Sequence, residues 1–388
     1  MKILMLSWNF APVIGGLEDL VTQQFAGLRR AGNDVRIATA HALDASREEG
    51  VLRASRPGLA AYLLHALRTG WSLSRRWQPD VILCGSVVTL PLGWLLSRCF
   101  RIRFVVIVYG GELVNEHWLV RPAIRFVLRG ADRIVAISRQ THRLAESIGL
   151  DPAKMSIVPP GVDLNRFDDP QAPESDATFE GRRVLLSVGR LVRRKGIQEF
   201  IERVLPRLVE ADPSVLYVVV GGDATASLAH RERLSDKIAA RIDALGLGDH
   251  ARLLGQLSNV ELVALFRRAD LFVLPVLDIP GDIEGFGIVF LEAALGFTAS
   301  VSTRVGGIPD AVSDGETGVL VAAGDHDAMA DAIGRLLADA ELRDRLARQG
   351  EARARSEFGW DAVVARLEKV LVAVQRDSGS APGSDPES

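Results

Sequence analysis

Cysteine is scarce in this chain of 388 residues. Its two cysteines, Cys84 and Cys99, stand in apolar segments without the spacing of metal ligands. This pattern excludes a disulfide scaffold and a thiolate metal site, and we expect two buried thiols in a reducing compartment.

A segment that could cross a membrane is also missing. The apolar start at residues 3–8 is too short for a secretory signal. The longest uncharged run, residues 81–97, is interrupted by Gly85, Ser86 and Pro91, whereas a transmembrane helix needs about 20 consecutive apolar residues. We therefore expect a strand and a helix in this run, and a cytoplasmic protein.

Two motifs of nucleotide sites are absent as well. No G-x-G-x-x-G sequence opens a predicted helix, which disfavours a dehydrogenase with a dinucleotide cofactor. No Asp-x-Asp sequence stands at a strand end in the context of a metal-bound nucleotide.

Acidic residues are few in the first part of the chain. Residues 1–167 hold 21 Lys and Arg against 13 Asp and Glu, and residues 168–388 hold 25 against 36, although the net charge is only −3. This asymmetry suggests that the first part meets an anionic partner.

Short apolar runs alternate with helical patterns along the chain. This alternation predicts an α/β fold with parallel sheets and crossover helices. The strand candidates are residues 2–8, 34–40, 80–86, 104–110 and 133–138 in the first half, and residues 184–190, 215–222, 251–256, 271–276 and 317–321 in the second.

A segment rich in Pro, Asp and Ser separates the two sets of strands. We predict a Rossmann-like domain at residues 1–165, a linker at 166–180 and a second Rossmann-like domain at 181–375, with a disordered polar tail at 376–388. Ligands of open α/β sheets bind beyond the carboxyl ends of the strands, so we expect the site in a cleft between the domains. The last helix is expected to pack one face on the protein, with the N-terminal domain as one partner.

Two glutamates stand in the segment IEGFGIVFLEAAL, residues 283–295, which otherwise reads as protein interior. Buried carboxylates are costly unless they are paired. Eight helical residues rise about 12 Å, so Glu284 and Glu292 suit the two ends of an extended ligand better than the close carboxyl pair of a retaining glycosidase. Gly285 and Gly287 lie between them at a predicted helix start, where backbone N–H groups favour anions. A nucleotide sugar has this layout, while a loop acid and a partly exposed helix residue are the alternative.

Basic residues follow the first strand of the second half, in GRLVRRKG at residues 189–196. Arg190 and Lys195 can reach one anion at the carboxyl edge of the sheet, and a solvated basic loop is the alternative. Paired glycines at Gly15-Gly16 and at Gly306-Gly307 also follow predicted strands, where they allow close approach to a ligand or form plain turns.

Together these segments resemble retaining glycosyltransferases of the GT-B fold, of the type called family 4, whose signature is E-x7-E. The resemblance spans almost the whole chain, from the first Gly-Gly pair through Glu284 and Glu292 to VGGIPDAVSDGETGVLV and the last helix. It implies two Rossmann-like domains that face each other across a central cleft.

The resemblance also implies roles for single residues. Arg190 and Lys195 bind the diphosphate of the donor, Glu284 contacts the sugar and Glu292 contacts the ribose. The catalytic candidates are Glu284, Arg190 and Lys195, and the donor-binding candidates are Gly15, Gly16, Arg190, Lys195, Leu257, Glu284, Gly285, Phe286, Gly287, Ile288 and Glu292. Leu257 belongs to a segment that lines the base in relatives. Neither a divalent metal nor a further cofactor is implied.

One position departs from the family. Many relatives have a histidine where this chain has Tyr109, which can donate a hydrogen bond but is a poor base near neutral pH. We place Tyr109 and Glu112 on the acceptor side, and the alternatives are that His117 or His142 approaches or that turnover is slow.

The predicted function is retaining transfer of a hexose from a UDP- or GDP-sugar to a glycan or lipid-linked acceptor in envelope or exopolysaccharide synthesis. The alternatives are a non-catalytic nucleotide-sugar sensor or partner subunit and a nucleotide-sugar epimerase. Nucleic acid is not expected as a partner.

Residues 59–78 raise a further hypothesis, which is peripheral attachment to the cytoplasmic membrane face. Leu59, Leu63, Leu67 and Trp71 share one helical face. Arg68, Arg75 and Arg76 supply a basic side, and Trp77 adds an aromatic. Such a helix can lie on anionic lipid, and the alternative is that its apolar face packs on the first sheet.

Overall fold

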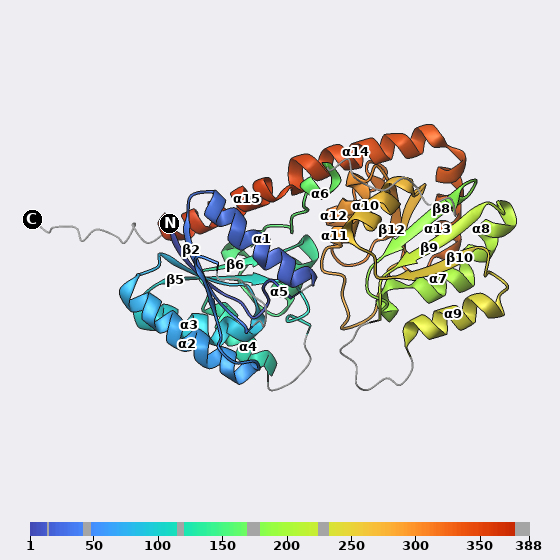
Figure 1. Ribbon diagram of the computed structural model, residues 1–388. Helices are drawn as coiled ribbons and strands as arrows, with labels where there is room; N and C mark the ends of the chain where they lie inside the picture. Colours follow the sequence, from blue (N-terminus) through green and yellow to red (C-terminus); the bar gives the residue numbers. More distant parts are fainter. Residues whose placement is uncertain (14, 42–47, 115–119, 169–178, 224–232, 377–388) are drawn as a thin grey trace, which may run out of the picture. The chain divides into compact units, whose positions relative to one another are not determined.

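The computed structural model describes residues 1–13, 15–41, 48–114, 120–168, 179–223 and 233–376. The chain forms two compact units, one of residues 1–161 with 360–388 and one of residues 162–359 (Figure 1). The division therefore falls before the expected linker, and the last helix belongs to the first unit. Most of the expected linker and nearly all of the expected tail lie outside the described residues.

The first unit contains a parallel sheet with strand order β3-β2-β1-β4-β5-β6-β7. Its strands are β1 (Lys2–Leu6), β2 (Asp34–Thr39), β3 (Val51–Arg53), β4 (Val81–Cys84), β5 (Arg103–Val108), β6 (Arg133–Ala136) and β7 (Met155–Ile157). Its helices are α1 (Gly16–Arg30), α2 (Leu59–Arg76), α3 (Leu90–Phe100), α4 (Val120–Arg129), α5 (Arg139–Ser147) and α15 (Trp360–Arg376), with short 3-10 turns η1 (Val87–Thr89) and η2 (Pro152–Lys154). Helices α1 and α15 pack together on one face of the sheet, and α2, α3 and α4 pack side by side on the other (Figure 1).

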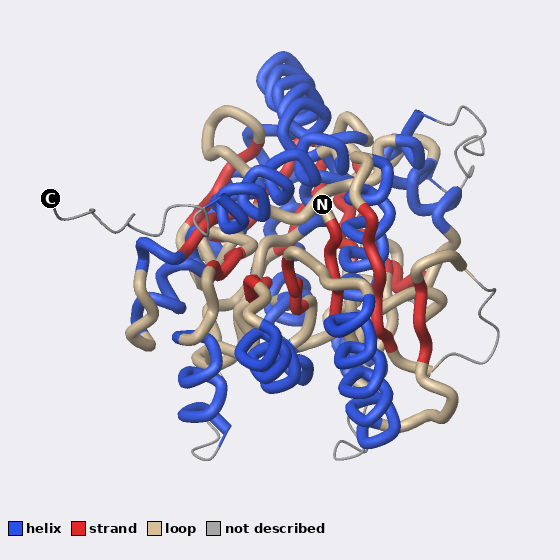
Figure 2. The backbone as a smooth tube through the Cα atoms, turned by 90° about the vertical axis from the view of Figure 1, so that its left-hand side faces the viewer, coloured by secondary structure: helices blue, strands red, loops and turns tan. Residues whose placement is uncertain are grey.

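The second unit contains a parallel sheet with strand order β10-β9-β8-β11-β12-β13. Its strands are β8 (Arg183–Val188), β9 (Val215–Val220), β10 (Ala251–Gly255), β11 (Leu271–Leu274), β12 (Ala299–Thr303) and β13 (Gly318–Val321). Its helices are α6 (Asn165–Asp168), η4 (Arg193–Lys195), α7 (Ile197–Arg203), α8 (Leu205–Ala211), α9 (Leu234–Ala244), α10 (Asn259–Arg268), α11 (Ile288–Leu295), α12 (Ile308–Ala311), α13 (His326–Ala338) and α14 (Ala340–Phe358). Helices alternate with strands along both units, and Figure 2 draws the helices in blue and the strands in red.

Burial explains why most strands were predictable. Every residue of β4, β9 and β11 is buried, so these strands read as continuous apolar runs. Strand β12, with sequence ASVST, is equally buried but was not predicted. Two of its three hydroxyls have carbonyl acceptors, because Ser302 Oγ donates to the Leu274 carbonyl and Thr303 Oγ1 donates to the Val276 carbonyl, each at 2.6 Å.

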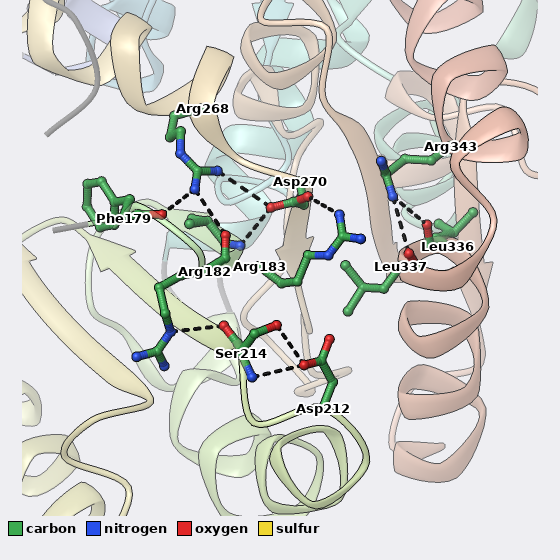
Figure 3. Close-up of polar contacts among 11 residues, drawn as sticks. Phe179, Arg182, Arg183, Asp212, Ser214, Arg268, Asp270, Leu336, Leu337 and Arg343 are labelled. Carbon is green, nitrogen blue, oxygen red and sulfur yellow. Dashed lines mark hydrogen bonds and ion pairs between the residues drawn. The ribbon is translucent and has the colours of Figure 1, made fainter. Parts of the chain in front are cut away.

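Aspartates fix the amino edges of both sheets. Asp270, directly before β11, accepts hydrogen bonds from the Val184 N–H (2.8 Å) and from Arg183 Nη1 (3.1 Å) of the neighbouring strand (Figure 3). The first unit repeats the arrangement, with Asp132 accepting from the Phe104 N–H (2.8 Å) and Arg103 Nη1 (2.7 Å), and Asp80 accepting from the Lys2 N–H (2.7 Å). These side chains hold the strand register at the edge opposite the carboxyl ends.

The expectations for cysteine and for membrane segments have different outcomes. Cys84 is buried in β4, but Cys99 is exposed, because it lies on the solvent side of α3. Among the described residues, no helix is both long enough and apolar enough to cross a membrane.

Candidate active site

The candidate donor site lies at the point where the strand order of the second sheet reverses. Strands β8 and β11 are neighbours there, and each is followed by a loop at the carboxyl edge of the sheet. Open α/β sheets leave a crevice at such a point. The topology therefore brings the segment after Gly189 next to the segment that contains Glu284, although they are far apart in the sequence.

Glu284 and Lys195 form a buried ion pair. Lys195 Nζ lies 2.8 Å from Glu284 Oε2, and the exposed fractions of the two side chains are 7% and 10%. Arg194 Nε lies 3.3 Å from the same oxygen, and Arg194 Nη1 lies 3.2 Å from Asp282 Oδ1. Sequence reasoning missed Arg194 as a partner of Glu284, and it placed Lys195 on the donor diphosphate rather than on a carboxylate.

The surroundings shift the pKa values of both partners. Burial raises the pKa of Glu284, but attraction to Lys195 and Arg194 outweighs burial and leaves the pKa below its usual value. Burial lowers the pKa of Lys195, and the nearby Arg194 and Arg190 lower it further, against the attraction of Glu284. Glu284 is therefore a fixed carboxylate within a cluster of cations.

Arg190 is the exposed cation of this cluster. Its guanidinium is close enough to influence Lys195, yet within the described part of the chain it has no carboxylate partner. Arg193 is exposed in the same loop. Because three cations (Arg190, Arg194 and Lys195) face two carboxylates (Asp282 and Glu284), the cluster has an excess positive charge that can receive an anion.

Tight backbone packing fixes the two loops. Gly196 has φ 68°, and a Cβ there would lie 1.9 Å from the Pro275 carbonyl oxygen, so only glycine lets the basic loop approach the end of β11. A Cβ on Gly307 would lie 2.1 Å from the Gly285 oxygen, and the Gly307 N–H donates to the Glu284 carbonyl at 2.9 Å. Gly306-Gly307, expected to line the cleft or form a turn, thus supports the loop that carries Glu284.

The loop continues into α11. Phe286 is buried, Gly287 has φ 90° directly before the helix, and Ile288 is its first residue. No side chain caps this helix start, so its first N–H groups are available to an anion.

Glu292 lies about one turn along α11 and is paired with Arg166. Arg166 Nη1 is 2.7 Å from Glu292 Oε1, and both side chains are mostly buried. Sequence reasoning missed this partner, because Arg166 stands at the start of a segment predicted to be a linker. Leu257, the candidate for the base, is half-buried beyond the carboxyl end of β10.

In the first unit, the Gly-Gly pair opens α1. Gly15 has extended backbone, and a Cβ there would lie 2.2 Å from Glu18 Oε2. The other oxygen of this carboxylate, Glu18 Oε1, accepts a hydrogen bond from Asn9 Nδ2. A Cβ on Gly16 would meet nothing within 4 Å. Gly15 therefore makes room for the Glu18 side chain, while Gly16 borders open space.

Tyr109 and Glu112 lie together after β5. The Tyr109 hydroxyl donates to the Gly85 carbonyl at 3.1 Å, and burial raises the pKa of this hydroxyl. Glu112 Oε1 accepts the Tyr109 N–H at 2.5 Å, and burial raises the pKa of Glu112 as well. Tyr109 is therefore a hydrogen-bond donor and not a base. His142 Nδ1 lies 3.5 Å from Glu146 Oε1 on α5, and His117 lies outside the described residues.

No metal site accompanies these groups in the described ranges, where no cluster of three or more His, Cys, Asp or Glu residues is placed to hold an ion.

Two family models match the chain in succession. The model described as Glycosyltransferase Family 4 matches residues 14–166, and the model described as Glycosyl transferases group 1 matches residues 168–353.

Similar proteins span nearly the same length. A D-inositol 3-phosphate glycosyltransferase of Actinosynnema mirum is 34% identical over 94% of this chain and 95% of its own. A GDP-mannose-dependent alpha-(1-6)-phosphatidylinositol monomannoside mannosyltransferase of Mycolicibacterium smegmatis is 34% identical over 75% of this chain and 76% of its own. The structure of HepE from Anabaena in complex with UDP has a TM-score of 0.75 and 20% identity, covering 96% of this chain and all of HepE, which shows a common fold.

Proposed function

The chain belongs to the glycosyltransferase family of these two models and has its GT-B fold, and we propose that it is a retaining hexosyltransferase that uses a UDP- or GDP-sugar. The family and the fold class predicted from the sequence are thereby confirmed. The donor, the acceptor and the stereochemistry remain our proposal.

The observation that carries the proposal is the cation cluster around Glu284. Lys195 is paired with the buried Glu284 at the switch point of a doubly wound sheet, and Arg190 is close enough to act on Lys195. A nucleotide sugar has a diphosphate for the cations and a sugar for the carboxylate. The relatives support this class of donor, since one is named as GDP-mannose-dependent and HepE was solved with UDP.

The chemistry follows from the charges. When the sugar–phosphate bond breaks, negative charge grows on the diphosphate, and Arg190, Lys195 and the first N–H groups of α11 stabilise it. In this proposal, side chains and backbone N–H groups stabilise the charge that a divalent metal stabilises in other transferases. Glu284 holds the sugar hydroxyls, and no protein nucleophile is placed for a covalent intermediate. We therefore propose that the acceptor attacks from the face that the leaving phosphate occupies, which retains the configuration.

We place the acceptor against Tyr109 and Glu112 of the first unit. Two relatives are named for inositol phosphate or phosphatidylinositol mannoside acceptors, which supports a glycan or lipid-linked acceptor. We propose a cytoplasmic enzyme attached peripherally to the membrane and active in envelope or exopolysaccharide synthesis.

A nucleotide-sugar sensor is the second candidate. The Tyr109 hydroxyl, at the position where many relatives have a histidine, is already engaged with the Gly85 carbonyl. A sensor would bind the donor without transferring its sugar.

The test is a panel of UDP- and GDP-sugars screened for thermal stabilisation, because a ligand at 100 times its Kd stabilises the native state by about 2.7 kcal/mol. The stabilising donor is then incubated with candidate acceptors in excess chelator. We expect a product in which the sugar keeps the anomeric configuration of the donor, as read from the anomeric proton signal in NMR spectra. Inverted product would overturn the retaining mechanism, loss of activity in chelator would overturn metal independence, and binding without transfer would favour the sensor.

Calorimetry with the free nucleoside diphosphate distinguishes the roles of Glu284 and Glu292. Glu292→Gln should weaken its binding, and Glu284→Gln should chiefly slow transfer, because the free nucleotide has no sugar for Glu284 to hold. Loss of nucleotide affinity in Glu284→Gln alone would contradict this assignment.

A further inference from the structure

Helices α2, α3 and α4 form a layer on one face of the first sheet, which we call the α2–α4 face. Their sequences contain seven arginines and no aspartate, glutamate or lysine. The arginines are Arg68, Arg75, Arg76, Arg98, Arg121, Arg125 and Arg129. A helical layer on a protein surface normally mixes charges of both signs, so the absence of acids needs a cause.

Four arginines of α2 and α3 have no partner in the part of the chain that the structure describes. Arg68, Arg75, Arg76 and Arg98 are exposed, and no ion pair or hydrogen bond joins them to another described residue. On the opposite face of the same sheet, Arg29 pairs with Glu49 (3.2 Å) and Arg30 pairs with Asp361 (3.3 Å). These two arginines of the opposite face thus have carboxylate partners, whereas the four of the α2–α4 face have none among the described residues.

Large apolar side chains are exposed among these arginines. Phe126 is 62% exposed, Leu64 is 49% exposed and Trp71 is 44% exposed, with Leu59 and Leu95 also exposed. Ring contacts hold the aromatics at the seams between helices, where Trp71 meets Phe100 (4.9 Å between centroids) and Phe126 meets Trp94 (5.5 Å).

The buried side of α2 differs from the predicted one. It consists of Tyr62, Ala66, Gly70 and Ser74, so the stripe that begins at Leu59 and ends at Trp71 lies partly in solvent. Trp77, predicted at the interface, is buried instead, and its indole N–H donates to Asp34 Oδ2 at 2.9 Å.

We propose that the α2–α4 face docks on the surface of an anionic lipid bilayer. Unpaired guanidinium groups attract anionic headgroups, and Phe126, Leu64 and Trp71 enter the interfacial region. Charge complementarity selects this occupant, because an uncharged surface would leave the arginines unpaired. The inference names the surface for the peripheral attachment proposed above, but lipid binding does not depend on transfer chemistry.

The experiment is co-sedimentation of the full-length protein with phosphatidylcholine vesicles, with and without phosphatidylglycerol, at low and high salt. We expect pelleting with the anionic vesicles alone and weaker pelleting at high salt, because salt shortens the Debye length from about 10 Å at 0.1 M to about 3 Å at 1 M. The double variant Arg68→Gln, Arg98→Gln should lower the partition coefficient by about thirtyfold, at about 1 kcal/mol per arginine. Phe126→Gln should weaken binding at both salt concentrations.

The matched control is Arg345→Gln, Arg348→Gln, which removes two exposed arginines from α14. It should pellet like the wild type. Thermal unfolding and nucleotide binding, measured on every variant, separate a lost docking surface from a damaged fold or donor site. Equal pelleting of both double variants, or no pelleting of the wild type with anionic vesicles, overturns the proposal, whether or not the enzyme transfers sugar.

Discussion

Arg190 and Lys195 are expected to serve the same diphosphate, but their surroundings differ. Lys195 is buried against Glu284, and Arg190 is exposed without a carboxylate partner. The sequence indicated only that both residues can reach one anion at the carboxyl edge of the sheet. Replacing Lys195 should therefore affect both stability and transfer, whereas replacing Arg190 should affect transfer alone.

Arg190→Ala should raise the activation free energy of transfer by about 3 kcal/mol, because one group that stabilises the developing charge is lost. The free energy of unfolding should change little. Lys195→Ala should slow transfer similarly and also destabilise the fold by about 3 to 5 kcal/mol, because it removes one partner of a buried ion pair. Single-turnover rates and urea unfolding measure the two effects. Arg193→Ala, an exposed neighbour, is the control and should resemble the wild type; equal stability of the two alanine variants would contradict this division.

The lowered pKa of Glu284 predicts a pH dependence of stability. A carboxyl whose pKa is lower in the folded than in the unfolded state stabilises the fold above its unfolded value, near pH 4.3, and this contribution disappears as pH falls through the folded value. The difference in unfolding free energy between the wild type and Glu284→Gln should therefore be largest near neutral pH and should shrink below about pH 4. Urea unfolding across this range measures it. Arg194→Ala should move the transition upward in pH, because a cation that lowers the pKa of Glu284 is lost; a difference that does not vary with pH would show that Glu284 is not paired.

The loop between β11 and α11 depends on the glycine pair that follows β12. Gly307 has φ near −87°, which alanine tolerates, so only the close approach to Gly285 requires glycine there. The donor site is thus supported by a segment that contains none of the donor-binding candidates.

Gly307→Ala should displace the Glu284 loop and lower both the transfer rate and the melting temperature. Gly334→Ala on α13 is the control, since a Cβ there meets nothing within 4 Å, and it should be neutral or stabilising by up to about 1 kcal/mol. Calorimetric unfolding and steady-state rates compare the two variants. Wild-type behaviour of Gly307→Ala would show that this packing does not fix the loop.

Most elements of the sheets could be predicted, because buried parallel strands read as apolar runs. The exceptions have physical causes. β3 and β7 have three residues each, and β12 carries hydroxyls that only its neighbours' carbonyls make compatible with burial. At the candidate site, the sequence indicated Glu284, Lys195 and Arg190 as a group, but the partners Arg194 and Arg166 came only from the fold, since long-range ion pairs leave no periodic signal.

The C-terminal helix completes the first unit, although it follows the second unit in the chain. It packs on α1 and buries Val363, Val364, Leu367, Leu371 and Val374. At about 1.5 to 3 kcal/mol for each buried side chain, removing the five costs about 7.5 to 15 kcal/mol, which is comparable with the roughly 5 to 15 kcal/mol by which a domain is stable.

Truncation before Trp360 should therefore unfold the first unit and leave the second protected. Hydrogen exchange with mass spectrometry locates the loss of protection, and truncation after Arg376, which keeps the helix, is the control. Undiminished protection of β1 and β2 in the shorter chain would contradict this role of α15.

The aspartates before β4, β6 and β11 have a consequence for how this enzyme can diversify. They lock each sheet at its amino edge through backbone N–H groups, while every candidate donor and acceptor residue lies at or beyond the carboxyl edge. Loops at one edge can thus be exchanged or lengthened without disturbing the register set at the other. New donor or acceptor specificity can then arise by grafting the segments after β8, β11 and β5 onto an unchanged frame, and directed evolution of this protein should accumulate its productive substitutions in those segments.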